Sequence, residues 1–298
     1  MSRRFVYLIN PISGVKGKEA ALELIKKRTS EKNIPFEIIP TNAEGNYHFL
    51  VDRIKNEGIT DLIICGGDGT VNQVANACRI AEVNIGIIPM GSGNGLAFAA
   101  KIPKKVDKAL DIIFKGHAME IDSFYINDKF SCMLCGLGFD AQVAHDFAKQ
   151  KTRGLLTYVK QTCKNFLSAK PYPFTIVIDG NELSTEAYFI SIANSNQFGN
   201  NFTIAPRASL YDGLLDIVIV NKMNKLRMLL SVLRQIRKGK IDEYDGHDPN
   251  QGIHYFHAKK VLIKNAQNAP LHIDGDPADT TGSFNIYIIE KAFRLLAP

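Results

Sequence analysis

The stretch DLIICGGDGTVN, residues 61–72, decides the fold because it joins a buried strand to a helix through a glycine turn. Its first half is an almost uninterrupted apolar run, which is typical of a strand covered on both faces. Adjacent glycines follow, and the sequence VNQVANACRIA, residues 71–81, then shows helical spacing. Asp68 therefore lies between two glycines in the tightest part of the turn, where a carboxylate needs an explanation.

The same strand–turn–helix unit recurs throughout the N-terminal part of the chain. Predicted strands cover residues 5–10, 36–41, 62–65 and 85–89, and predicted helices cover residues 19–33, 47–58, 71–81 and 96–102. Apolar strands that alternate with helices are typical of a doubly wound parallel sheet with helices on both faces. We therefore predict an N-terminal α/β domain.

The pattern changes after about residue 123, where short alternating strands dominate. They fall within residues 124–139, 174–195, 214–220, 252–266, 269–276 and 284–290, and helical stretches lie near residues 146–169 and 223–238. Asp179, Gly180 and Asn181 mark a hairpin turn. An antiparallel β-sandwich-like domain is the natural interpretation. We therefore expect an α/β domain in residues 1–123 and a β-rich domain in residues 124–290.

Composition and charge narrow the class of protein. The chain has 298 residues, of which 45% are hydrophobic and 22% charged, as in folded globular proteins. The net charge of +6 favours anionic partners, although simple solubility explains it equally well. No run of basic residues interleaved with aromatics is present, so nucleic-acid binding is not expected.

The cysteines and the apolar segments indicate where the protein works. The cysteines are odd in number and mostly surrounded by apolar residues, which favours free thiols in the cytoplasm. Cys132 and Cys135 form a C-x-x-C pair with no second pair, so packing is preferred over a zinc site. No stretch approaches the roughly 20 apolar residues of a spanning helix, so any membrane contact is expected to be peripheral.

Three predicted strand ends carry loops of one kind: NPISGVKGK at residues 10–18, GGDGT at 66–70 and MGSGNG at 90–95. Glycines let backbone N–H groups approach phosphate oxygens, and each following helix presents its positive end. Ordinary turns, with Thr70 and Gln73 as a capping box, are the alternative. A carboxylate at Asp68 fits beside phosphates only if a cation such as Mg²⁺ lies between them. The P-loop and dinucleotide-binding patterns are absent.

The motifs NPISG, GGDGTVNQVAN, IGIIPMGSGNGLA, YDGLLDIVIV and IDGD together resemble the diacylglycerol kinase catalytic family. This family includes soluble bacterial diacylglycerol kinases and the related YegS-type, sphingosine and ceramide kinases. The resemblance extends over nearly the whole chain. It implies an ATP-binding α/β domain and a β-rich lipid-binding domain with ATP in the cleft between them, and it implies that residues 291–298 return to the first domain.

The resemblance also implies roles for individual residues. The nucleotide-binding positions would be Asn10, Lys16 or Lys18, Gly66, Gly67, Asp68, Gly69, Thr70, Asn72, Ser92, Gly93 and Asn94. Asp68, with Asp122 through a water, would hold Mg²⁺ at the phosphates. Asp212, with the carbonyls of Ser209 and Leu214, would bind a structural magnesium.

Two departures from the family pattern matter. Many bacterial members have an aspartate after the asparagine of the second loop and an arginine further on, whereas this chain has Gly95 and Phe98. The loop thus looks closer to sphingosine and ceramide kinases. The family's D-G-E is here Asp274-Gly275-Asp276, so the carboxylate of Asp276 is one methylene shorter.

The reaction that the resemblance implies is transfer of the γ-phosphoryl group of MgATP to a lipid hydroxyl presented by a membrane surface. Diacylglycerol, a sphingoid base and ceramide are the candidate acceptors. Asp276 is the preferred proton acceptor and Asp68 the alternative. The basic, amphipathic stretch 222–240 could meet an anionic surface, although a helix packed on the sheet is favoured.

Other functions stay open at this stage. A soluble-substrate kinase of the NAD kinase type shares GGDGT, and a nucleotide-binding regulator without catalysis would explain the departures at Gly95 and Asp276. A homodimer also stays open.

Overall fold

The computed structural model describes residues 3–9, 18–42, 44–150, 161–162, 164–166, 168–199, 202–223 and 252–298. The predicted ligands Asn10 and Lys16 lie outside these residues, as does nearly all of the predicted helix 223–238. The described chain separates into two compact units, one made of Met1–Asp122 and Glu290–Pro298 and the other of Ser123–Ile289.

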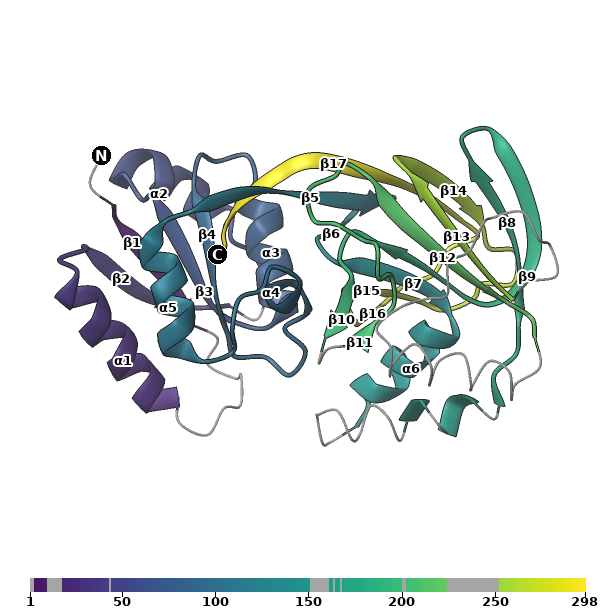
Figure 1. Ribbon diagram of the computed structural model, residues 1–298, viewed down its shortest axis with the longest axis horizontal. Helices are drawn as coiled ribbons and strands as arrows, with labels where there is room; N and C mark the ends of the chain where they lie inside the picture. Colours follow the sequence, from purple (N-terminus) through teal and green to yellow (C-terminus); the bar gives the residue numbers. More distant parts are fainter. Residues whose placement is uncertain are drawn as a thin grey trace. The chain divides into compact units, whose positions relative to one another are not determined.

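The first unit is built on a parallel sheet (Figure 1). Its strands are β1 (Phe5–Ile9), β2 (Phe36–Pro40), β3 (Asp61–Gly66) and β4 (Asn84–Pro89), in the order β2-β1-β3-β4. The C-terminal end of β17 (Ser283–Leu296) adds a further parallel pairing, of Arg294 and Leu295 with Asn84 and Ile85. Every residue of β1 and β3 is buried, as the unbroken apolar runs require.

Helices cover both faces of this sheet. They are α1 (Lys18–Glu31), α2 (Phe49–Glu57), α3 (Asp68–Cys78), α4 (Gly95–Ala99) and α5 (Val106–Lys115). The chain runs from β1 to β2 in one direction and from β3 to β4 in the other, so right-handed crossovers put α1 opposite α2 and α3. Accordingly α1 packs on α5, and α2 packs on α3. The predicted doubly wound α/β fold is confirmed.

The helix boundaries differ from the sequence prediction in two places. Helix α3 begins at Asp68 rather than at residue 71, so the aspartate lies in the first helical turn. Helix α5 was not predicted. Its buried residues Ala109, Leu110, Ile112 and Ile113 have helical spacing, and Gly116 ends it with a φ of 73°.

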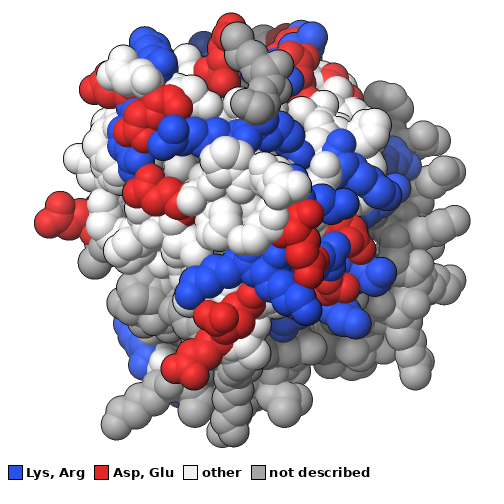
Figure 2. Space-filling view, turned by 90° about the vertical axis from the view of Figure 1, so that its left-hand side faces the viewer, with Lys and Arg blue, Asp and Glu red and all other residues white. Residues whose placement is uncertain are grey.

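Oppositely charged side chains are interspersed on the surface of the first unit. Arg28 pairs with Asp107 and Asp111, which ties α1 to α5. Arg53 pairs with Glu37 and Glu57. Figure 2, which views the side on which α1 and β2 lie in Figure 1, shows blue and red side chains next to one another. The net positive charge is therefore not gathered into one patch on the described part of this face.

The second unit is antiparallel. Its strands are β5 (Ala118–Ile126, shared with the first unit), β6 (Lys129–Ser131), β7 (Leu134–Gly138), β8 (Tyr172–Ile178), β9 (Asn181–Ala193), β10 (Gln197–Gly199), β11 (Phe202–Thr203), β12 (Leu215–Asn221), β13 (Ile253–Ala258), β14 (Lys260–Lys264), β15 (Leu271–Ile273), β16 (Asp276–Ala278) and the first part of β17. Long strand β9 organises it, because it pairs with β8, β7 and β12. Asp179 and Gly180 form the predicted hairpin turn with φ angles of 50° and 81°.

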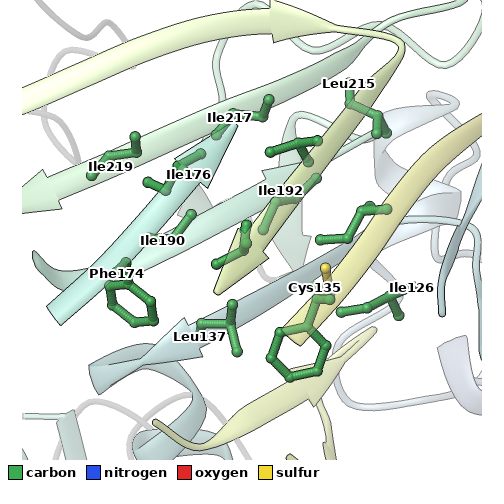
Figure 3. Close-up of a cluster of buried hydrophobic side chains, with 14 of the residues drawn as sticks. Ile126, Cys135, Leu137, Phe174, Ile176, Ile190, Ile192, Leu215, Ile217 and Ile219 are labelled. Carbon is green, nitrogen blue, oxygen red and sulfur yellow. The ribbon is translucent and has the colours of Figure 1, made fainter. Parts of the chain in front are cut away.

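One apolar cluster holds the second unit together (Figure 3). Ile190 and Ile192 of β9 lie between Cys135 and Leu137 on β7 and the isoleucines of β12, all fully buried. Alternate residues of each strand point into this cluster, as a β-sandwich-like core requires. The predicted packing role of Cys135 is confirmed, and burial raises the pKa of its thiol.

Helix α6 (Phe139–Ala148) follows β7 directly and begins earlier than the predicted stretch near 146. The ring Nε2 of His145 lies 2.7 Å from the carbonyl oxygen of Leu271, which fastens the helix to β15. Among the described residues, no helix is long and apolar enough to span a membrane.

Candidate phosphate-binding and phosphoryl-transfer site

The GGDGT loop lies at the point where the strand order of the first unit reverses. Strand β3 ends at Gly66, and α3 begins at Asp68, with Gly67 as its N-cap residue. Ligands of doubly wound sheets bind outside the carboxyl ends of the strands at this switch point. The N-cap residue Gly67 makes no side-chain cap hydrogen bond, and the first N–H groups of an α-helix have no acceptor within the helix, which suits them to anion binding.

The GGDGT loop packs directly against the MGSGNG loop. A Cβ on Gly91 would lie 2.6 Å from the Cα of Gly67, and a Cβ on Gly67 would lie 3.2 Å from the Cα of Gly91. Side chains at these positions would push the loops apart. The two loops are therefore in direct contact, and the glycines are needed for this close backbone approach.

Asn94 closes the second loop on itself. Its side-chain oxygen accepts a hydrogen bond from the N–H of Gly91, and its side-chain nitrogen donates to the carbonyl of the same residue, both at 2.8 Å. Asn94 is buried and has a φ of 55°, a left-handed conformation that asparagine tolerates better than most residues. We therefore interpret Asn94 as the residue that shapes the loop. Ser92, at the tip of the loop, is exposed, and Gly93 is partly exposed.

The carboxylate of Asp68 connects the two loops. Its Oδ1 accepts a hydrogen bond from the N–H of Leu96 at 3.3 Å, in the first turn of α4. A Cβ on Gly93 would lie 2.9 Å from Oδ2, so glycine leaves the room that this oxygen occupies. Asp68 is partly exposed, as are Gly67 and Gly69. The carboxylate thus lies where anionic oxygens would meet two helix N-termini.

Thr70 and Asn72 belong to α3. The alternative interpretation of Thr70 and Gln73 as a capping box is wrong, because the helix begins at Asp68 and its N-cap is Gly67. Thr70 is buried against Gly66, where an added Cβ would lie 3.2 Å from the Thr70 Oγ1. Asn72 is partly buried, and the side chain of Lys18 lies outside the described atoms.

Asp122 is a buried carboxylate with a structural contact. Its Oδ1 accepts a hydrogen bond from the N–H of Lys291 at 2.8 Å, and Lys291 has a φ of 53°. This bond fixes the C-terminal strand β17 to β5 within the first unit. The predicted water-mediated link from Asp122 to a metal stays a prediction.

The predicted structural magnesium site lies in the turn before β12. The N–H of Leu214 donates to Oδ1 of Asp212 at 3.1 Å, and Gly213 between them has a φ of 73°. Asp212 is exposed, whereas Ser209 and Leu214 are partly buried. Among the described residues, no group of three or more His, Cys, Asp or Glu side chains could hold a metal ion. Carbonyl ligands do not enter such a group, so this site also stays a prediction.

The two aspartates of IDGD have different surroundings. Asp274 is buried, and its carboxylate accepts hydrogen bonds from the hydroxyl of Ser131 and from the N–H groups of Cys132, Met133 and Leu134, at 2.6–3.2 Å. Asp276 begins β16 and is exposed. Asp274 thus anchors the turn, and Asp276 is the exposed carboxylate of the two.

Sequence reasoning missed Asp274, Asp140 and His272. The Nε2 of His272 lies 3.4 Å from Oδ2 of Asp140 and both side chains are buried, so a polar pair lies beneath the turn that carries Asp276. Asp140 is in the first turn of α6 and His272 is in β15, and neither position has a sequence pattern that predicts their contact. They come together because β15 pairs with β7, which leads into α6.

Comparison with known proteins agrees with this architecture. Residues 4–126 match the family model of the diacylglycerol kinase catalytic domain, and residues 134–296 match that of the YegS C-terminal NAD kinase β-sandwich-like domain. The chain therefore belongs to the diacylglycerol kinase catalytic-domain family, with a YegS-type C-terminal domain. Membership of this family supports a lipid kinase-like function.

Individual relatives are distant in sequence but align with nearly the whole of this chain. A diacylglycerol kinase of Staphylococcus aureus is 27% identical, with 100% of this chain and 93% of the relative covered. An uncharacterised protein of Synechocystis is also 27% identical, over 98% of this chain and 69% of its own length. A solved structure from Bacillus anthracis has a TM-score of 0.81 at 20% identity and covers 99% of this chain and 96% of its own. This structure supports the fold alone.

Proposed function

We propose that the protein is an ATP-dependent lipid kinase that transfers the γ-phosphoryl group of MgATP to a lipid hydroxyl. Diacylglycerol, which would give phosphatidic acid, and a sphingoid base or ceramide are the candidate acceptors. The observation that carries the proposal is the packing of Gly67 on Gly91, which holds two glycine loops and the N-terminus of α3 around the carboxylate of Asp68.

The backbone of these loops supplies the contacts that a polyphosphate needs. The N–H groups at the start of α3 and the positive end of the helix dipole favour negatively charged oxygens. Gly67 and Gly69 leave the backbone partly exposed, so phosphate oxygens can approach it. Phosphoryl transfer depends mainly on such positioning and charge neutralisation.

The residues of this site fit a divalent cation. Asp68 offers a partly exposed carboxylate, the oxygen donor that Mg²⁺ prefers. Mg²⁺ usually takes one or two carboxylates and completes its shell with water and substrate phosphates, so a group of three protein ligands is not needed. When bound, the ion neutralises charge on the phosphate oxygens. Asp122 would act on it through water.

Asp276 is the proposed proton acceptor. Its carboxylate is exposed, whereas the carboxylate of Asp274 is occupied by four strong hydrogen bonds. As the O–P bond to the acceptor forms and the bond to the leaving ADP oxygen breaks, Asp276 takes the hydroxyl proton. With Asp276 as proton acceptor, the carboxylate of Asp68 can serve as the ligand of the cation.

An assay of substrates tests the proposal. Purified protein is incubated with γ-labelled ATP and Mg²⁺ in mixed micelles that contain diacylglycerol, a sphingoid base or ceramide, and in a separate reaction with NAD. Label in one lipid supports the proposal and identifies the acceptor. Label in NAD would support the soluble-substrate alternative. Binding of ATP without label in any acceptor would support a regulator and overturn the proposal.

A further inference from the structure

The turn that carries Asp276 is a two-residue hairpin between β15 and β16. Ile273 pairs with Asp276, and the two residues between them, Asp274 and Gly275, have φ angles of 50° and 87°. Positive φ at both central residues defines a type I′ turn, which Asp-Gly favours. The direction in which Asp276 leaves the turn therefore depends on what holds Gly275.

The side chain of His272 contacts the backbone of Gly275. The N–H of Gly275 donates to Nδ1 of His272 at 3.4 Å, and the imidazole is fully buried. A nitrogen that accepts a hydrogen bond carries no proton, so the proton of the neutral ring is on Nε2. This contact requires one tautomer of the ring.

Asp140 selects that tautomer. Its Oδ2 lies 3.4 Å from Nε2 of His272, where it accepts the Nε2 proton, while its Oδ1 accepts the N–H of Ala141 at 2.8 Å. A carboxylate on one ring nitrogen fixes the protonation of the other. The pair needs Gly136 beneath it, because a Cβ on Gly136 would lie 2.5 Å from the Nε2 of His272 and would also overlap Oδ2 of Asp140.

We propose that His272 is a positioning residue for Asp276. Asp140 fixes the Nε2–H tautomer, and the unprotonated Nδ1 accepts the N–H of Gly275, so that the turn presents Asp276 to the acceptor hydroxyl. The inference rests on the proposed function, in which Asp276 accepts the proton. It deepens that function, because it explains how the short side chain of aspartate is aimed.

Two amide variants separate the two sides of the imidazole. In His272→Asn the side-chain oxygen can replace Nδ1, so the contact with Gly275 is kept and the contact with Asp140 is lost. In His272→Gln the amide can replace Nε2, so the contact with Asp140 is kept and the contact with Gly275 is lost. Both variants lose the imidazole ring. A difference between them therefore reflects the contact that each one keeps and not the lost ring volume.

The kinetic result distinguishes positioning from simple stabilisation. We expect kcat to fall about tenfold in His272→Gln and by no more than about threefold in His272→Asn, with the KM for ATP unchanged in both. Asp140→Asn should resemble His272→Gln, because an amide can donate to Nε2 and so favour the other tautomer. Equal kcat values for the two His272 variants would overturn the inference.

A measurement that needs no activity completes the test. In the full-length wild-type protein labelled with ¹⁵N, His272 should show an unprotonated Nδ1, and the Gly275 amide should exchange with solvent about tenfold more slowly than in His272→Gln. A protonated Nδ1, or equal exchange, overturns the inference. The wild-type protein could transfer no label to any acceptor and still show the expected tautomer and amide exchange. In that case the proposed function is wrong and the role of His272 toward a hydroxyl is overturned. The tautomer and the contact with Gly275 would still be supported.

Discussion

Gly67 and Gly91 meet backbone to backbone, so that a single methyl group on Gly91 would lie 2.6 Å from the Cα of Gly67. These residues lie in the segments that follow β3 and β4, which are neighbours in the parallel sheet. The two loops therefore form one surface, in which Asp68 contacts the N–H of Leu96 and Asn94 contacts the N–H of Gly91.

Gly91→Ala should damage both stability and nucleotide binding. The added Cβ must displace the backbone of Gly67, and overpacking of this kind costs about 1–3 kcal/mol of unfolding free energy. Chemical denaturation and calorimetric titration with MgATP would measure the two effects. Gly282→Ala is the control, because nothing lies within 4 Å of a Cβ at Gly282. Unchanged MgATP affinity in Gly91→Ala would contradict a role for the joined loops.

Asp68→Asn isolates the charge of Asp68 from its structural contact. The amide oxygen can still accept the N–H of Leu96, so the protein should fold normally. Loss of the carboxylate should reduce phosphoryl transfer by about 10²-fold or more and should weaken the dependence of ATP binding on Mg²⁺. Circular dichroism and titrations with and without Mg²⁺ would check this. Wild-type turnover in a folded Asp68→Asn protein would show that the metal assignment is wrong.

Replacement by asparagine should affect activity at Asp276 and stability at Asp274. Asp276→Asn should lower kcat by about 10²-fold and leave the melting temperature unchanged, because Asp276 is exposed. Asp274→Asn should lower the unfolding free energy by about 1–3 kcal/mol, because an amide cannot accept all the hydrogen bonds from residues 131–134. Melting curves and initial rates would be compared for both variants. A wild-type kcat in Asp276→Asn would contradict Asp276 as the proton acceptor and would favour the alternative, Asp68.

Asp216 should make the stability of the fold depend on pH. It is fully buried on β12, contacts the hydroxyl of Tyr255 and lies 3.2 Å from Nε2 of His257. Burial raises its pKa to about 6. The folded state therefore binds the proton more tightly than the unfolded state, and this stabilisation is lost as pH rises from about 4 through 6.

Between pH 4 and 7 the unfolding free energy of the wild type should thus fall relative to Asp216→Asn by on the order of 2–3 kcal/mol. Urea denaturation at constant ionic strength would measure the difference. Asp279→Asn is the control, since the carboxylate of Asp279 is exposed. Parallel pH curves for the wild type and Asp216→Asn would contradict the raised pKa.

Peripheral membrane contact predicts sensitivity to lipid charge. The protein should sediment with vesicles that contain phosphatidylserine at low salt and should be released by about 0.5 M salt, because screening removes the attraction of basic side chains. Vesicles of phosphatidylcholine alone are the control. Equal sedimentation with both vesicles at every salt concentration would leave no role for anionic lipids.

The sequence predicted most strands and the glycine loops because each has a local pattern, but it missed helix α5. It placed the start of α3 too late, since a helix whose N-cap is Gly67 carries none of the usual side-chain signals. The anchoring role of Asp274 could not be predicted, because it comes from hydrogen bonds with the backbone of residues 132–134, far away in sequence. The loop-closing role of Asn94 depends in the same way on its backbone conformation.

The first unit includes the end of strand β17, which is synthesised after the whole second unit. Residues 290–298 belong to this unit, and Arg294 and Leu295 pair with β4, although the whole second unit lies between them in the chain. During synthesis, β4 can pair with β3 early, but its second edge has no partner until Arg294 and Leu295 have been made. A truncation that removes Arg294 and Leu295 would therefore damage the unit that was made first.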